Sequence, residues 1–189
     1  AAMQNLPDFY TDKNGLQQPQ GAIVAMNPHN GYIVAMVGGR GDDALNRATQ
    51  AERQPGSAMK PFVYLAAIQS GKTPGSIVED SPVSFGSWSP KNYENDYEGS
   101  MTYRYALQHS HNVAAVKIAD EVGMTKVIKL AKEMGISTLT DQDYNLSTAL
   151  GGLTHGVTPL EMVQAYGVLA NGGIKVQPTA ILKIAASFS

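Results

Sequence analysis

The fold is decided by the stretch Ser57-Ala58-Met59-Lys60-Pro61-Phe62-Val63-Tyr64-Leu65-Ala66-Ala67-Ile68-Gln69-Ser70-Gly71. It predicts a helix that begins near Ser57 and ends at Gly71, because proline is tolerated in a first helical turn and glycine commonly ends a helix. From Pro61 to Ile68 the segment is apolar nearly all round. Helices of this kind lie inside a protein, so we expect a central helix with other elements packed around it.

An apolar hairpin is predicted upstream of this helix. Residues 21–26 and 32–37 are two β-type runs, joined by Asn27-Pro28-His29-Asn30-Gly31. Asn-Gly between such runs favours a hairpin turn. Both runs are apolar on both faces, so we expect the strands to be covered on both sides. Residues 1–20 are polar and are expected to form a linker that leads into the domain.

The sequence downstream of the central helix changes from loop-rich to helical. Residues 72–101 are rich in proline, glycine and aromatic side chains, and a long loop of this kind inside a domain is often functional. Helices are then predicted over 110–122, 126–134 and 158–171, and a short strand over 180–184. Thr158 and Glu161 form a capping box at the start of the last helix, with Pro159 at its first position.

The composition excludes several classes of function. The 189 residues are 43% hydrophobic and 16% charged, which is enough apolar sequence to bury a core and excludes a disordered chain. Lys and Arg number 14 against 16 Asp and Glu, so there is no basic excess for nucleic acid. No run approaches the length of a membrane-spanning helix. Cysteine is absent, and the four histidines show no ligand spacing, so we expect no metal.

Ser57 and Lys60 form the first motif that indicates a catalytic function. They stand three residues apart and so share one face of a helix. A serine hydroxyl is a poor nucleophile until a base takes its proton. Lysine is such a base only when neutral, which requires its pKa to fall from about 10.4 through desolvation or nearby positive charge. A capping serine with a surface lysine is the alternative, and the two residues alone leave it open.

Ser110-His111-Asn112 is the second motif, and it follows the long loop region. Serine enzymes that react with penicillin combine S-x-x-K with S-D-N and K-T-G. Here His111 stands in the place of the aspartate. The alternative is that Ser110 caps a helix and Asn112 is a polar residue of its first turn.

With these motifs in this order, the sequence resembles the transpeptidase domain of penicillin-binding proteins, in particular the bifunctional class A type. The resemblance runs from about Gly21 to Ile184. The matching blocks are Asn46-Arg47-Ala48-Thr49, Arg53-Gln54-Pro55-Gly56-Ser57-Ala58-Met59-Lys60-Pro61-Phe62, Trp88-Ser89-Pro90-Lys91-Asn92-Tyr93, Ala106-Leu107-Gln108-His109-Ser110-His111-Asn112-Val113, Val157-Thr158-Pro159-Leu160-Glu161-Met162, and Ala165-Tyr166 through Ala170-Asn171-Gly172-Gly173.

The resemblance implies an α/β (α+β) fold of the β-lactamase/transpeptidase type. In this chain it would comprise the N-terminal hairpin of an antiparallel sheet and a mainly helical subdomain. We expect residues 21–189 to be a partial transpeptidase domain whose sheet is incomplete.

The resemblance also implies a D,D-transpeptidase that cross-links peptidoglycan. Ser57 would attack the carbonyl between the two terminal D-alanines of a stem peptide, and Lys60 would take its proton. Ser110 would relay a proton to the leaving amine, and Asn112 would hold Lys60 and the substrate amide. β-Lactam antibiotics would acylate the same serine.

Three further residues are expected to border the substrate-binding cleft: Trp88, Tyr93 and His111. We expect His111 to line the cleft or to face solvent. The resemblance implies no metal and no organic cofactor.

One family motif is missing from the sequence. The sole Lys-Thr pair is Lys72-Thr73, which precedes Ser110 and is followed by Pro74 instead of glycine. The resemblance places Lys-Thr-Gly on a strand beyond the end of this chain, where it would bind the substrate carboxylate and complete the oxyanion hole. A lone two-stranded sheet is marginal in water. We therefore expect the isolated chain to be impaired and the C-terminal half of the domain to join it as a second chain; a domain cut short is the alternative.

Other functions stay open at this point. They are a D,D-carboxypeptidase, in which water replaces the acceptor amine, and a catalytically incomplete β-lactam sensor or half-domain. The resemblance places the protein on the outer face of the bacterial cytoplasmic membrane, anchored by a segment outside this chain.

Overall fold

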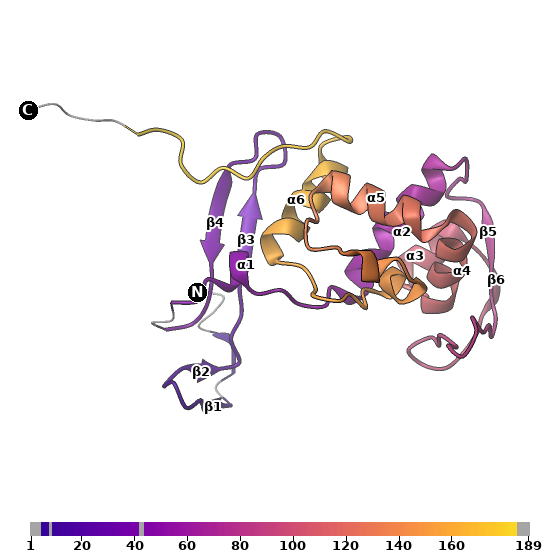
Figure 1. Cartoon of the computed structure of the whole chain (residues 1–189), viewed down its shortest axis with the longest axis horizontal. Coiled ribbons are helices and arrows are strands. Elements are labelled where there is room, and N and C mark those ends of the chain that lie inside the picture. The colour runs from indigo at the N-terminus through magenta and orange to yellow at the C-terminus, as the bar shows by residue number, and fades with distance from the viewer. Residues whose placement is uncertain (1–4, 8, 42–43, 185–189) are drawn as a thin grey trace, which may run out of the picture. The chain divides into compact units, whose positions relative to one another are not determined.

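The computed structural model describes residues 5–7, 9–41 and 44–184, and these residues form two compact units (Figure 1). The first unit takes in the described residues within 1–53, 134–137 and 157–189, and the second takes in 54–133 and 138–156. Helices and three antiparallel strand pairs make the described part α+β. Residues 1–4 and 8 of the expected linker and residues 42–43 and 185–189 of the expected domain lie outside the described residues.

The first unit is built on a hairpin of two apolar strands. β3 (Ile23–Met26) pairs with β4 (Ile33–Val37) in antiparallel register, which confirms the predicted hairpin with slightly shorter strands. α6 (Pro159–Ala170) packs against β3 and begins with the capping box predicted at Thr158. The unit also contains β1 (Tyr10–Thr11), β2 (Gln17–Gln18) and α1 (Arg47–Gln50).

Two expectations for this unit are wrong. The hairpin is not covered on both sides in the described part of the chain, because Val34 is 68% exposed and Ile23 and Val37 are also exposed. Residues 180–184 form no strand. A single parallel bridge joins Thr179 to Tyr32, and the residues after it find no partner strand in the described part of the chain.

The second unit is mainly helical and surrounds α2. Residues 56–59 form a 3-10 turn, η2 (Gly56–Met59), which continues into α2 (Lys60–Gln69) with Pro61 in its first turn. α2 packs against α4 (Asn112–Val122), and most of its side chains are buried, which confirms the predicted central helix. The other helical segments are α3 (Tyr103–Gln108), α5 (Met124–Met134), η3 (Asp141–Asp143) and η4 (Leu146–Leu150).

The region expected to be a long loop contains the third antiparallel strand pair. β5 (Ile77–Asp80) pairs with β6 (Gly99–Thr102), and Asp80 lies opposite Gly99. The two strands are only four residues long, and β5 ends in two acidic residues, a composition that strands usually avoid. Side chains alternate along β5, so Asp80 points inward. This strand pair thus places a buried carboxylate inside the helical unit.

Candidate active site

Lys60 lies at the centre of the candidate site, where α2 begins. Its side chain is 1% exposed. Nζ donates to the Ser110 carbonyl oxygen at 2.5 Å, to Ser110 Oγ at 2.9 Å and to Asn112 Oδ1 at 2.6 Å. The structure therefore brings together three of the residues that the two sequence motifs single out.

Burial changes the acid–base chemistry of this lysine. Desolvation penalises the ammonium form and lowers the pKa of Lys60 from 10.5 to about 8. The three contacts suit either form of the side chain. An ammonium donates to all three oxygens, whereas a neutral amine donates to the carbonyl of Ser110 and to Asn112 and accepts the Ser110 hydroxyl with its lone pair. Lys60 can thus exchange a proton with Ser110 without losing a partner.

Ser57 stands in η2, one turn before Lys60. Its backbone carbonyl accepts the Lys60 N–H, and its side chain is exposed. Within the described part of the chain, no hydrogen bond engages the Ser57 hydroxyl. The hydroxyl is open to a reactant from solvent, at a helix start where developing negative charge is stabilised.

Ser110 adopts a strained backbone conformation in the turn between α3 and α4. Its φ of 58° lies in the left-handed region, which costs a residue with a side chain about 1–2 kcal/mol. In this turn both its carbonyl oxygen and its hydroxyl reach Lys60. The predicted helix over 110–122 accordingly begins at Asn112, because Ser110 is not helical.

A second segment of the same unit packs against the turn that carries Ser57. Gly151 lies so close to Gly56 that a Cβ on Gly151 would be 2.3 Å from the Gly56 amide nitrogen. The side chain of Gln54 joins the same two segments through two hydrogen bonds. Its Nε2 donates to the Leu153 carbonyl at 2.7 Å, and its Oε1 accepts the Leu153 N–H at 2.6 Å. Sequence analysis missed this support, since its partners lie far apart in the chain.

The three residues expected to border the substrate cleft lie in different surroundings. Tyr93 is 95% exposed, and Trp88 is half-buried with its ring 6.3 Å from that of Phe85. His111 is buried, so the expectation that it faces solvent is wrong, and its place beside the cleft stays a prediction. Its Nδ1 lies 3.1 Å from a carboxylate oxygen of Asp80, and its Nε2 lies 3.4 Å from a carboxylate oxygen of Glu98. A substrate-binding role for Trp88, Tyr93 and His111 stays a prediction.

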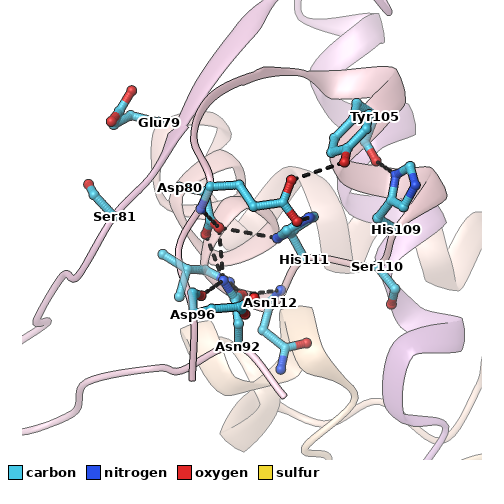
Figure 2. Close-up of polar contacts among 12 residues, drawn as sticks. Glu79, Asp80, Ser81, Asn92, Asp96, Tyr105, His109, Ser110, His111 and Asn112 are labelled. Atoms are coloured by element: carbon cyan, nitrogen blue, oxygen red, sulfur yellow. Dashed lines mark hydrogen bonds and ion pairs between the residues drawn. The ribbon is translucent and has the colours of Figure 1, made fainter. Parts of the chain in front are cut away.

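Sequence analysis missed two buried polar residues near the start of α4, Asn92 and Asp80 (Figure 2). Asn92 contacts Asn112, and Asp80 contacts Asn92 and His111. Asn92 belongs to a block that carries the family resemblance, which was the available signal. Nothing local in the sequence marks Asp80 as part of a site.

The described residues contain no group of three or more histidine, aspartate or glutamate side chains placed to hold a metal ion. None of the helices in that part of the chain combines the length and the hydropathy needed to cross a bilayer.

Comparison with known proteins identifies the relatives of this chain. A family model described as penicillin binding protein transpeptidase domain matches residues 21–188. The chain is 40% identical over 171 residues to penicillin-binding protein 1A of Rickettsia prowazekii (strain Madrid E), covering 86% of this chain and 21% of that protein. It is 42% identical over 173 residues to penicillin-binding protein 1A of Aquifex aeolicus (strain VF5), covering 87% and 23%. The chain thus spans about a fifth of the length of these relatives.

Solved structures give the same result for the fold. The chain is similar to the crystal structure of penicillin-binding protein 1A from Haemophilus influenzae, with a TM-score of 0.79 and 34% identity over 90% of this chain and 27% of that one. It is also similar to PonA1 from Mycobacterium tuberculosis in complex with penicillin V, with a TM-score of 0.76 and 26% identity over 87% of this chain and 47% of that one. The fold class and the resemblance inferred from the sequence are confirmed.

Proposed function

The chain belongs to the penicillin-binding protein transpeptidase domain family, and from this premise we propose that it carries the acylation site of a peptidoglycan D,D-transpeptidase. The observation that carries the proposal is the arrangement around Lys60. This lysine is buried, its pKa is lowered to about 8, and it contacts Ser110 and Asn112 one helical turn after an exposed Ser57.

The proposed reaction has two steps of acyl transfer. In the first, neutral Lys60 takes the Ser57 proton, Oγ forms an ester bond to the carbonyl of the penultimate D-alanine, and the C–N bond to the terminal D-alanine breaks. The proton passes through Ser110 to the leaving amine. In the second, the amine of a neighbouring stem peptide attacks the ester and releases Ser57. A β-lactam follows the first step and leaves its acyl group on Ser57.

The exposed face of the hairpin favours an extension of this proposal. Val34, Ile23 and Val37 are exposed on β3–β4, and a two-stranded sheet is marginal without further cover. We propose that a C-terminal part of the domain, with a Lys-Thr-Gly strand as the resemblance implies, adds strands to this hairpin, within the same protein or as a second chain. The 189-residue chain alone is then a β-lactam-binding module with impaired turnover.

The proposed place of action is the outer face of the bacterial cytoplasmic membrane, where the cross-linked stem peptides lie. In this proposal a segment outside the chain provides the anchor. A D,D-carboxypeptidase uses the same acyl-enzyme but passes the acyl group to water, so the acceptor decides between the two activities.

Intact mass under denaturing conditions tests the acylation step. We expect the full-length protein to gain the mass of one benzylpenicillin, and the Ser57→Ala variant to gain none. Ser70→Ala is the matched control, because Ser70 follows the same helix but lies outside the site, and it should label like the unchanged protein. Labelling that persists in Ser57→Ala, or an unlabelled full-length protein, contradicts the proposal.

Two further measurements separate the alternatives. A synthetic stem pentapeptide incubated with an excess of an amine acceptor should yield an amide product, whereas a carboxypeptidase yields only the hydrolysed tetrapeptide. The 189-residue chain should label slowly alone and faster when the C-terminal part is added. Equal labelling with and without that part contradicts the proposed completion of the sheet.

A further inference from the structure

The helix that carries Asn112 has no cap within its own sequence. His111 is the N-cap residue of α4, and its side chain makes no capping hydrogen bond. The first N–H groups of a helix need acceptors from elsewhere. Oδ1 of Asn92 accepts the N–H of Asn112 at 3.0 Å and that of Val113 at 3.1 Å (Figure 2). Asn92 therefore caps α4 from a separate loop.

The surroundings of Asn92 allow its amide only one orientation. Its Nδ2 lies 3.0 Å and 2.9 Å from the two carboxylate oxygens of Asp80 and 2.8 Å from the Asp96 carbonyl oxygen, and these oxygens only accept hydrogen bonds. The N–H groups of α4 only donate. A rotation of the amide by half a turn would therefore oppose oxygen to oxygen and N–H to N–H. Asn92 is also buried, so water does not replace these partners.

Asp80 holds this arrangement from the end of β5. Its side chain is 0% exposed. Besides Asn92, the carboxylate accepts the Glu98 N–H at 3.1 Å and lies 3.1 Å from Nδ1 of His111. A buried carboxylate is tolerated only with such a set of donors. Asp80 thus joins β5, the loop before β6 and the turn before α4 (Figure 2).

The same loop also holds the side chain of Asn112. Its Nδ2 donates to the Lys91 carbonyl at 3.0 Å, while its Oδ1 accepts Lys60 Nζ at 2.6 Å. Both the backbone and the side chain of Asn112 therefore depend on residues 91–92. We infer that Asn92 and Asp80 are positioning residues for acyl transfer, which fix Asn112 and, through it, the amine of Lys60. This inference rests on the proposed function, and neither residue contacts the reacting atoms.

The first test removes the cap in the full-length protein. We expect Asn92→Ala to lower the second-order rate of acylation by a fluorescent penicillin by about 10- to 100-fold, since a small misplacement of a catalytic group has effects of this size. The rise of this rate with pH should also move to higher pH, because water that enters beside Lys60 relieves its desolvation. Changes in stability alone do not move a pH profile measured per folded molecule.

Thr158→Ala is the matched control, because it removes the cap of α6 in the other unit. It should lower the melting temperature as the loss of a cap does, and leave the acylation rate per folded molecule and its pH profile unchanged. If Asn92→Ala behaves like this control, the positioning role is overturned. An unchanged protein that is not acylated at Ser57 would instead overturn the proposed function.

An exchange of the two side chains provides the second test. Asn92→Asp places two buried carboxylates against each other, so we expect it to lose acylation and stability. Combined with Asp80→Asn, it restores one donor and one acceptor across the contact but leaves a carboxylate oxygen against the Asp96 carbonyl. Acylation should therefore recover only in part, by about tenfold over Asn92→Asp, the change that one good hydrogen bond supports. No recovery in the double variant overturns the pairing. The exchange also decides the matter if Asn92→Ala does not fold.

Discussion

At the scale of single residues, Lys60 joins burial to three oxygen partners, and the two features have different consequences. Burial makes the neutral amine accessible near pH 8. The oxygens of Ser110 and Asn112 fix where the amine lies. A buried lysine without these oxygen partners would have a neutral amine whose position is not fixed. A lysine with the partners but without burial would have a fixed amine that stays protonated.

The pH dependence of acylation follows from this pKa. In the proposed mechanism neutral Lys60 is the active form, so the second-order rate of β-lactam acylation should rise with pH and reach half its plateau near pH 8. The free energy of unfolding should rise as the pH increases from about 8 to 10.5, because in this range Lys60 keeps its proton in the unfolded chain and has lost it in the folded protein. Rapid-mixing fluorescence in the full-length protein and urea titrations measure the two quantities.

Lys60→Arg is the control for this prediction, because a guanidinium stays charged at all these pH values. It should remove the rise with pH and lower the rate by about 10²–10⁴-fold, the usual contribution of a general base. A rate of the unchanged protein that is already level at neutral pH would show that another group is the base.

The sequence predicts the site only where its motifs are local. The three-residue spacing predicts that Ser57 and Lys60 share a helix face. The family resemblance adds Ser110 and Asn112 to the same site. The roles of Asp80 and Asn92 could not be predicted from spacing, because these residues are distant in sequence from the start of α4 that they contact. The sequence around His111 also does not show that the helix after it lacks a side-chain cap of its own. The left-handed φ of Ser110 has no local signal either, since serine seldom adopts it.

At the scale of elements, we expect the close contact between Gly151 and Gly56 to maintain the shape of η2. In Gly151→Ala, a Cβ would lie 2.3 Å from the Gly56 nitrogen and 2.4 Å from its oxygen, in a residue whose φ is 78°. We expect this variant to lose more than the about 1–2 kcal/mol that the φ angle alone costs, and to lose acylation as well. Urea unfolding and fluorescent penicillin labelling of the full-length protein measure the two losses.

Gly71→Ala is the control that separates backbone strain at a positive φ from a steric clash of the new Cβ. Gly71 has a φ of 94°, but a Cβ there meets nothing within 4 Å. This variant should show the cost of the φ angle and unchanged acylation per folded molecule. Equal effects of the two substitutions would mean that the contact with Gly56 does not support Ser57.

The elements that the sequence predicts are those with strong signals at their ends. Pro61 and Gly71 bound the central helix, and the capping box of Thr158 and Glu161 marks α6. β5 and β6 lack such signals, because each strand has only four residues and a long loop separates the two strands in the sequence. Short strands of this kind form by tertiary packing, which a local pattern does not encode.

At the scale of the whole molecule, the two units differ in how well their elements are covered. α2 and α4 are buried in the helical unit, whereas Val34 and its neighbours on β4 remain exposed. In the 189-residue chain, we expect the amides of β3–β4 to exchange with deuterium faster than those of α4, because a hairpin with one exposed apolar face opens readily. Hydrogen exchange followed by mass spectrometry resolves the two segments.

The full-length protein is the comparison for this prediction. If further strands cover the hairpin there, the exchange of β3–β4 should slow while that of α4 changes little. Equal exchange of β3–β4 in both proteins would contradict the proposed addition of strands.

The cap that Asn92 provides has a consequence for the order of folding. The start of α4 is complete only when the loop between β5 and β6 has closed and Asp80 has entered the interior. Closing such a loop costs entropy before any contact repays it. We therefore expect the amine of Lys60 to be set in place late on the folding pathway, so that a newly made molecule acquires its reactivity only after its tertiary structure is finished.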